Sequence, residues 1–116
     1  MTRLSLALSF ALTLACGSSA ATSAPPDDGQ PRFEIDVGAS GYTPAELHAP
    51  PSTPIHVGFL RSSDEGCGGE LVIPSMSLHR TLPLNERVWV DVITPASGRL
   101  AFTCGMGMYQ GAIVAD

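Results

Sequence analysis

The sequence predicts an all-β fold, a sandwich or barrel built from short strands. About six to eight short segments are continuously apolar or alternate apolar and polar residues, and turn residues separate them. Ten prolines, twelve glycines and a charged content of 15% suit a turn-rich β-protein. No segment shows a helical repeat of about ten residues or more. The 116 residues provide for one domain and not two.

The chain begins with the features of an export signal. Arg3 supplies a positive charge, and residues 4–15 form an apolar run far shorter than the ~20 residues of a membrane span. The run ends in Ala15-Cys16, and a small residue directly before a cysteine resembles a bacterial lipoprotein cleavage site. We expect residues 1–15 to be a signal peptide and Cys16 to be lipidated. Cleavage elsewhere would instead remove Cys16 or leave it unpaired.

Residues 16–31 are predicted to form a flexible tether. Small, polar and proline residues fill this segment, and nothing in it could build a hydrophobic core. Such a tether holds a domain off a membrane surface, in agreement with a lipid anchor at Cys16. We therefore expect an exported protein of the periplasm or cell envelope, with its folded domain at residues 32–116.

Three segments give the clearest strand patterns in that domain. Residues 32–37 and 55–59 alternate apolar side chains with polar residues or glycine, and residues 87–93 form the strongest strand of the chain. We expect the core to contain the inward-facing apolar side chains Phe33, Ile35, Val57, Phe59, Val90 and Phe102.

Shorter elements connect these segments. Glycine, proline and small polar residues predict turns at residues 38–41 and 94–98, and three prolines interrupt the chain at residues 50–54. Residues 61–69 are predicted to be a polar, glycine-rich loop, and residues 75–84 an irregular segment. The remaining strands are expected near residues 70–74, 99–103 and 111–114, and a short run at residues 46–48 lies between the first turn and the prolines.

The densest group of soft donor atoms is Cys104-Gly105-Met106-Gly107-Met108, between the last two predicted strands. Thiolate and thioether are soft donors suited to Cu(I). The two glycines tolerate positive φ, so a short loop could turn several side chains onto one point. Methionines, however, often only fill cores, and a cysteine of an exported domain is often half of a disulfide. Both interpretations stay open on this stretch alone.

Four stretches of the predicted domain form a set. They are Gly-Tyr-x-Pro at residues 41–44, Cys67-Gly68-Gly69-Glu70-Leu71-Val72-Ile73-Pro74, Leu82-Pro83-Leu84, and Phe102-Thr103-Cys104-Gly105-Met106-Gly107-Met108. Together they resemble the EfeO-type cupredoxin-like domains, which are also found attached to copper-handling P-type ATPases. The resemblance covers residues 33–114, and the last stretch is its most specific motif.

The resemblance implies a Greek-key antiparallel β-sandwich with a copper site at one end. It assigns Cys67, Cys104 and Met108 to that site. Met106 matches the same motif, and Glu70 is a candidate oxygen ligand. The expected ion is Cu(I), with the cysteines as thiolates and the methionines as neutral thioethers.

The chain departs from ordinary blue-copper proteins, which need two histidines, a cysteine and a weak axial ligand. The first loop offers Cys67, and the last loop contains no histidine. His48 and His56 fall on outward-facing strand positions, and His79 falls in the predicted irregular segment. We therefore expect all three histidines at the surface.

The charge of the chain and its motifs disfavour several classes of function. Six arginines, no lysine and eleven acidic residues give a net charge of -5, which disfavours nucleic acid and anionic lipid surfaces as partners. No Ser-His-Asp grouping, phosphate loop or paired-carboxylate pattern predicts an enzyme.

The first expectation is a copper-binding module for storage, delivery or tolerance, with a periplasmic copper exporter or acceptor protein as candidate partner. Two alternatives stay open. One is a disulfide-closed structural or interaction domain without metal, in which Cys67 pairs with Cys104. The other is an electron carrier with an atypical copper site.

Overall fold

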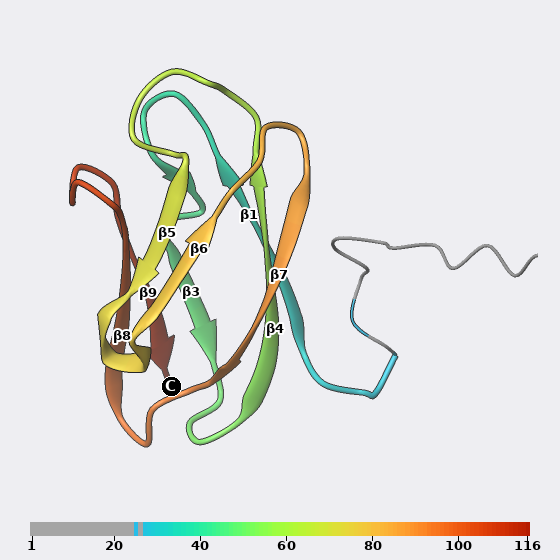
Figure 1. Ribbon diagram of the computed structural model, residues 1–116. Coiled ribbons are helices and arrows are strands. Elements are labelled where there is room, and N and C mark those ends of the chain that lie inside the picture. Colours follow the sequence, from blue (N-terminus) through green and yellow to red (C-terminus); the bar gives the residue numbers. More distant parts are fainter. Residues whose placement is uncertain (1–24, 26) are drawn as a thin grey trace, which may run out of the picture.

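The computed structural model describes residue 25 and residues 27–116, and strands dominate this part of the chain (Figure 1). The strands are β1 Arg32–Val37, β2 Tyr42–Thr43, β3 Glu46–Ala49, β4 Pro54–Arg61, β5 Glu70–Ile73, β6 Leu78–Thr81, β7 Arg87–Ile93, β8 Gly98–Cys104 and β9 Gln110–Ala115. The described residues contain no helix long and apolar enough to cross a membrane. The predicted signal peptide, the lipidation at Cys16 and most of the predicted tether lie outside the described residues.

The predicted all-β sandwich is confirmed. One sheet has four strands in the order β2-β1-β4-β7, and the other has five in the order β3-β9-β8-β5-β6. The pairing differs from a purely antiparallel pattern in two places, because β1 runs parallel to β4 and β3 runs parallel to β9. After β1 the chain turns into β2, crosses to the other sheet as β3 and returns as β4. The strands β1 and β4 therefore do not form a hairpin. They lie side by side and run in the same direction.

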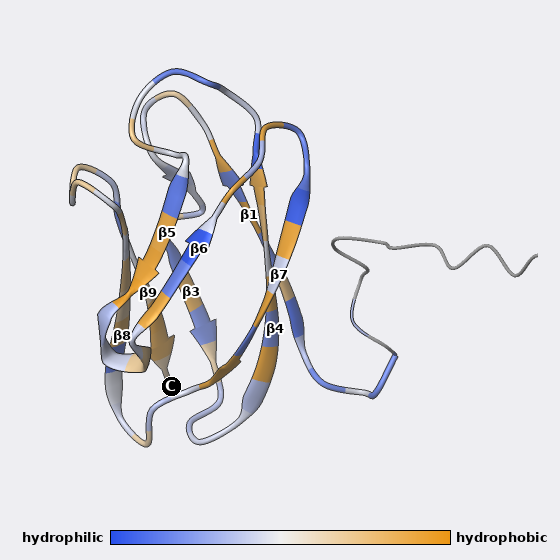
Figure 2. Cartoon of the chain, in the orientation of Figure 1, coloured by the Kyte–Doolittle hydropathy of each residue, from blue (hydrophilic) through white to orange (hydrophobic). Residues whose placement is uncertain are grey.

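Alternation of side chains builds the core between the sheets. Figure 2 shows hydrophobic and hydrophilic bands alternating along β1, β4 and β7. Five of the six predicted core side chains are at most 1% exposed, and Phe33 is the exception. It lies near the start of β1, is only partly buried and packs against the edge of the core.

Four aromatic rings fill the end of the core that lies beside the cysteines. Tyr42 packs edge-to-face against Phe59, Phe102 and Tyr109, with ring centroids 6.2, 4.9 and 5.8 Å away. The Tyr42 hydroxyl is buried and has no hydrogen-bond partner among the described residues. Burial, with a smaller contribution from Tyr109, raises the pKa of Tyr42 to about 12, so this side chain stays neutral.

One element differs from its prediction. Pro74, predicted to end the strand at residues 70–74, begins a 3-10 turn, Pro74–Met76. Within the segment predicted to be irregular, Leu78–Thr81 forms β6, which pairs antiparallel with β5. Ser77 reverses the chain between them, with φ of 50°. This edge strand extends the five-stranded sheet and brings His79 into it.

The expectation that His56 lies at the surface is wrong. Its side chain does point to the outer face of β4, but the residue is only 5% exposed. The central position of β4 explains this, because neighbouring side chains cover its outer face: Asp28 and Asp91 enclose His56, and Arg87 and Trp89 cover Gly58.

Candidate metal site

Two of the predicted site residues are joined at one end of the sandwich. Cys67 lies in the loop between β4 and β5, and Cys104 is the last residue of β8. Their sulfurs form a disulfide, with the Cα atoms 5.9 Å apart. Cys104 is 1% exposed, and Cys67 is partly buried against the core. The structure therefore brings the two sulfurs together, in their oxidised form.

Backbone hydrogen bonds hold the start of the methionine loop, residues 105–108. Gly107 N–H donates to Cys104 O at 3.0 Å, and Cys104 N–H donates to Tyr109 O at 3.2 Å. Gly107 has a φ of +74°, a conformation that favours glycine. Tyr109 N–H also donates to Cys104 Sγ at 3.2 Å. A donor aimed at this sulfur would stabilise negative charge on it once the disulfide is reduced.

Tyr109 fixes the far end of the same loop. Its side chain is 6% exposed, and its hydroxyl donates to Gly38 O at 3.0 Å and Ala39 O at 2.6 Å. Those carbonyls belong to the turn between β1 and β2. The loop is thus attached to both sheets at its base.

The two methionines of the loop lie outside this fixed base. Met106 is 81% exposed and Met108 is 70% exposed. Neither fills the core, so the core-packing interpretation of these methionines is wrong. Both thioethers stand in solvent within four residues of Cys104.

Glu70, the candidate oxygen ligand, lies against the start of the loop. It is the first residue of β5, whose next residue Leu71 pairs with Cys104. A Cβ atom at Gly105 would lie 2.9 Å from Glu70 Oε2. On its other side, Glu70 Oε1 accepts a hydrogen bond from His79 Nδ1 at 3.0 Å.

These residues fit a soft metal ion only after the disulfide is reduced. Two thiols, two thioethers and one carboxylate then border one end of the sandwich. Among the described residues, no group of three or more His, Cys, Asp or Glu side chains could hold a metal. A metal bound at this end would therefore depend on the methionine sulfurs as well, and these favour Cu(I).

His48 and His79 are exposed, and each forms an ion pair with carboxylates. His48 is exposed, as expected, and contacts Glu46 at 3.0 Å and Asp116 at 2.8 Å. Hydrogen bonding to Asp116 is the main cause that raises the pKa of His48. His79 is also exposed, but its bond to Glu70 connects it to the candidate site.

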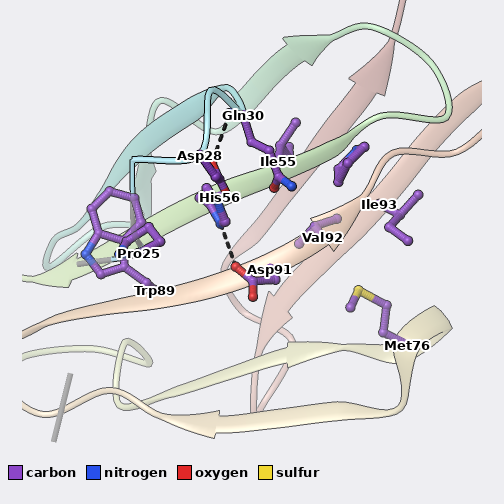
Figure 3. A pocket seen from close by; sticks show the side chains of 11 residues that line it. Pro25, Asp28, Gln30, Ile55, His56, Met76, Trp89, Asp91, Val92 and Ile93 are labelled. Carbon is purple, nitrogen blue, oxygen red and sulfur yellow. Dashed lines mark hydrogen bonds and ion pairs between the residues drawn. The ribbon is translucent and has the colours of Figure 1, made fainter. Parts of the chain in front are cut away.

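His56 forms a separate cluster on the four-stranded sheet (Figure 3). Its Nδ1 lies 2.6 Å from Asp91 Oδ1, and its Nε2 lies 2.9 Å from Asp28 Oδ2. Hydrogen bonds to Asp28 and then to Asp91 raise the pKa of His56. The cluster borders an open hollow of about 780 Å³, whose apolar wall includes Trp89 and Ile93. None of the predicted metal-site residues lines this hollow.

Sequence reasoning missed two residues that shape the candidate site. Tyr109 is the residue directly after the motif, and its burial depends on carbonyls about 70 residues away in sequence. His79 was placed at the surface without a role. An assignment of residues 78–81 to a strand paired with β5 would have brought it beside Glu70.

Solved structures of other proteins resemble this chain. The metal-binding domain of the Cu(I)-exporting P-type ATPase CopA of Streptococcus pneumoniae D39, crystallised with Cu(I), is 23% identical with a TM-score of 0.67, over 82% of this chain and 94% of that one. A copper binding protein solved by NMR in the apo form is 32% identical with a TM-score of 0.61, over 72% of this chain and 88% of the other. Reduced auracyanin of Roseiflexus castenholzii is 15% identical with a TM-score of 0.55, over 73% and 96%. The curated proteins gave no match.

Two mixed sheets around one core, with a cysteine closing the strand before the last loop, define a β-sandwich of the cupredoxin kind. The family model described as "Cupredoxin-like domain" matches residues 5–115. The chain therefore belongs to the cupredoxin-like domain family.

Proposed function

We propose that this chain is an exported copper-binding protein that holds Cu(I) through sulfur in its reduced form. The expected ligands are Cys67, Cys104 and Met108, with Met106 and Glu70 as further donors. The role is storage, delivery or tolerance of copper, and not catalysis. Within the family, the motif around Cys104 favours the EfeO-type variant over a blue-copper protein.

One observation carries the proposal: Cys104, bonded to Cys67, is followed directly by a four-residue loop whose two methionines are both exposed to solvent. A disulfide alone would need no methionine nearby, and methionines that only packed the core would be buried. Exposed thioethers in the loop that follows a paired cysteine instead offer soft donors that are open to solvent. The relative at 32% identity, a copper binding protein, supports copper as the ion.

Binding requires a change of redox state at the cysteines. Thiol–disulfide exchange with a dithiol reductant supplies the two electrons and two protons that convert the disulfide into two thiols, and the reductant becomes a disulfide. Cu(I) then displaces the thiol protons, which pass to solvent. The Tyr109 N–H that points at Cys104 Sγ favours the charged thiolate there. The neutral thioethers add affinity without adding charge to the site.

Export and anchoring belong to the same proposal. The apolar run before Cys16 and the tether behind it support a lipid-anchored protein of the periplasm or cell envelope. Its partner would be a copper exporter or an acceptor protein in that compartment. Replacement Cys16→Ser should release the protein from membranes or stop its processing, and unchanged partitioning into detergent would favour ordinary secretion.

The direct test is anaerobic titration of the reduced chain with Cu(I) against a competing chelator, with thiols counted before and after. We expect Cys104→Ser to abolish binding. We expect Met108→Leu to weaken it by at least about tenfold. Since Met108 is exposed, that variant should change the metal-free free energy of unfolding by no more than about 0.5 kcal/mol.

Met76→Leu is the matched control, because Met76 lies in the 3-10 turn that follows the last residue of β5, whereas Glu70 is the first residue of that strand. Its Cu(I) affinity should equal that of the wild type. Equal affinity of Met108→Leu and wild type would remove Met108 from the site.

The second candidate is a disulfide-closed interaction domain without metal, which the observed Cys67–Cys104 bond favours. This candidate predicts that the reduced wild-type chain fails to bind Cu(I). It also predicts that Met106→Leu and Met108→Leu are silent in every assay of function.

A further inference from the structure

Glu70 is held between two neighbours at the border of the candidate metal site. One carboxylate oxygen, Oε1, accepts the hydrogen bond from His79 Nδ1 at 3.0 Å. The other, Oε2, faces Gly105, where a Cβ atom would come within 2.9 Å of it. The imidazole therefore occupies one oxygen while the other oxygen points at the first residue of the methionine loop.

The strand register creates this arrangement. Val72 pairs with His79 and Glu70 pairs with Thr81 between β5 and β6, so Glu70 and His79 are diagonal neighbours on one face of the sheet. On its other side, β5 pairs with β8 at the position of Cys104. Three adjacent strands thus place an imidazole, a carboxylate and the start of the loop in one row.

A glutamate at this position needs a partner to keep its orientation. Its side chain is 48% exposed, and ordering a free glutamate costs rotamer entropy. A hydrogen bond from His79 to one oxygen removes much of this freedom before any metal arrives. Groups that orient a ligating carboxylate typically change metal affinity by about 10–100-fold.

We propose that His79 is a positioning residue, which holds Glu70 so that its second oxygen faces a metal bound at the methionine loop. The proposal rests on the proposed function, because it requires that the reduced chain binds Cu(I). It differs from direct ligation by His79, because the imidazole acts only through the carboxylate.

The test compares Cu(I) affinities of the reduced full chain by competition with a chelator. His79→Leu should weaken binding by about tenfold, and Glu70→Gln by at least as much. The double variant should bind as Glu70→Gln does, because His79 has nothing left to position. His79→Asn should restore most of the affinity, since the asparagine amide N–H stands near the place of Nδ1.

A second readout needs no metal. In the reduced, metal-free chain, NMR coupling constants along the Glu70 side chain should indicate one main rotamer in the wild type and in His79→Asn. They should indicate averaging in His79→Leu. His48→Leu is the matched control, because His48 is an exposed histidine paired with carboxylates at β3 and Asp116. It should leave both readouts unchanged.

Several results would overturn the proposal while leaving the proposed function intact. They are wild-type affinity in His79→Leu or in Glu70→Gln, a further loss of affinity in the double variant, and unrestricted Glu70 rotamers in the wild type. Absence of Cu(I) binding by the wild-type chain would instead refute the proposed function itself.

Discussion

Two cross-links connect distant parts of this chain, and they depend on different conditions. The covalent bond between Cys67 and Cys104 joins the β4–β5 loop to the end of β8 at one end of the sandwich. The ionic cluster of Asp28, His56 and Asp91 joins the segment before β1 to β4 and β7. The first link is broken by reduction and is insensitive to moderate pH. The second link is broken by loss of a proton and is insensitive to thiols.

The disulfide lies at the proposed metal site, whereas the ionic cluster attaches the segment before β1 to its sheet. The redox-sensitive link contains the proposed ligands, so reduction should loosen this end of the domain and free the thiols in the same step. The proton-sensitive link lies on the other sheet and contains no sulfur. It attaches Asp28, near the end of the predicted tether, to β4 and β7, whatever the state of the cysteines.

Loss of the covalent link should give the largest effect on stability. The bond closes a separation of 37 residues, and removing such a bond costs about 3–4 kcal/mol in the free energy of unfolding. We therefore expect a clearly lower urea midpoint for the Cys67→Ser/Cys104→Ser double variant than for the oxidised wild type. Equal midpoints would mean that packing alone holds this end.

The ionic link should make stability depend on pH. Its two carboxylates raise the pKa of His56 above the unfolded value of about 6.5. The contribution of His56 is therefore complete below about pH 6.5 and is lost as pH rises through the raised folded pKa. Thermal unfolding at a series of pH values should show this decline, and His56→Gln should flatten it.

Two controls sharpen that comparison. The raised pKa of His48 adds a decline of the same sign, so His48→Gln must be measured beside His56→Gln. The cysteine double variant should keep the full decline at lower overall stability. Loss of the decline in that variant would mean that the two links are coupled.

At acid pH, Asp28 should make stability change with pH in the opposite direction. The backbone N–H of Gln30, followed by His56, lowers the pKa of Asp28. Stability from Asp28 is therefore present above about pH 4 and is lost as pH falls through the lowered folded pKa. Asp28→Asn should reduce this acid-side loss in unfolding measured between about pH 2 and 5, and an unchanged loss would remove Asp28 from the cluster.

The smallest effect concerns hydrogen bonds beside the disulfide. Tyr109→Phe removes the donor to Gly38 O and Ala39 O and should cost about 1–2 kcal/mol in the free energy of unfolding. Tyr42→Phe is its matched control, since the Tyr42 hydroxyl is buried without a partner among the described residues. That variant should be neutral or stabilising in the same urea experiment, and equal losses would contradict the assigned contacts.

Alternating side chains were enough to predict the sandwich and most of its core. They could not predict β6, because it is an edge strand whose side chains are mostly exposed and whose residues show no apolar alternation. Nor could they predict the parallel pairings, since alternation marks the buried face of a strand and not its partner.

The candidate site was predictable only in part. The motif around Cys104 located the sulfurs, but pattern alone could not decide between free thiols and the disulfide that the structure shows. His56 was misplaced because its cover comes from Asp28, 28 residues away in a segment that was expected to be an unattached tether.

Because the two loop methionines are exposed, their thioethers are open to oxidative damage. A thioether in solvent is open to peroxides, which convert it to a polar sulfoxide. The sulfoxide no longer offers sulfur as a neutral soft donor, so oxidation would remove the proposed methionine ligands without disturbing the fold. Mass spectrometry of peroxide-treated protein should show oxygen added at Met106 and Met108 before Met76, which is 38% exposed. Enzymatic reduction of the sulfoxides would then restore binding, and this would make copper capacity depend on methionine repair.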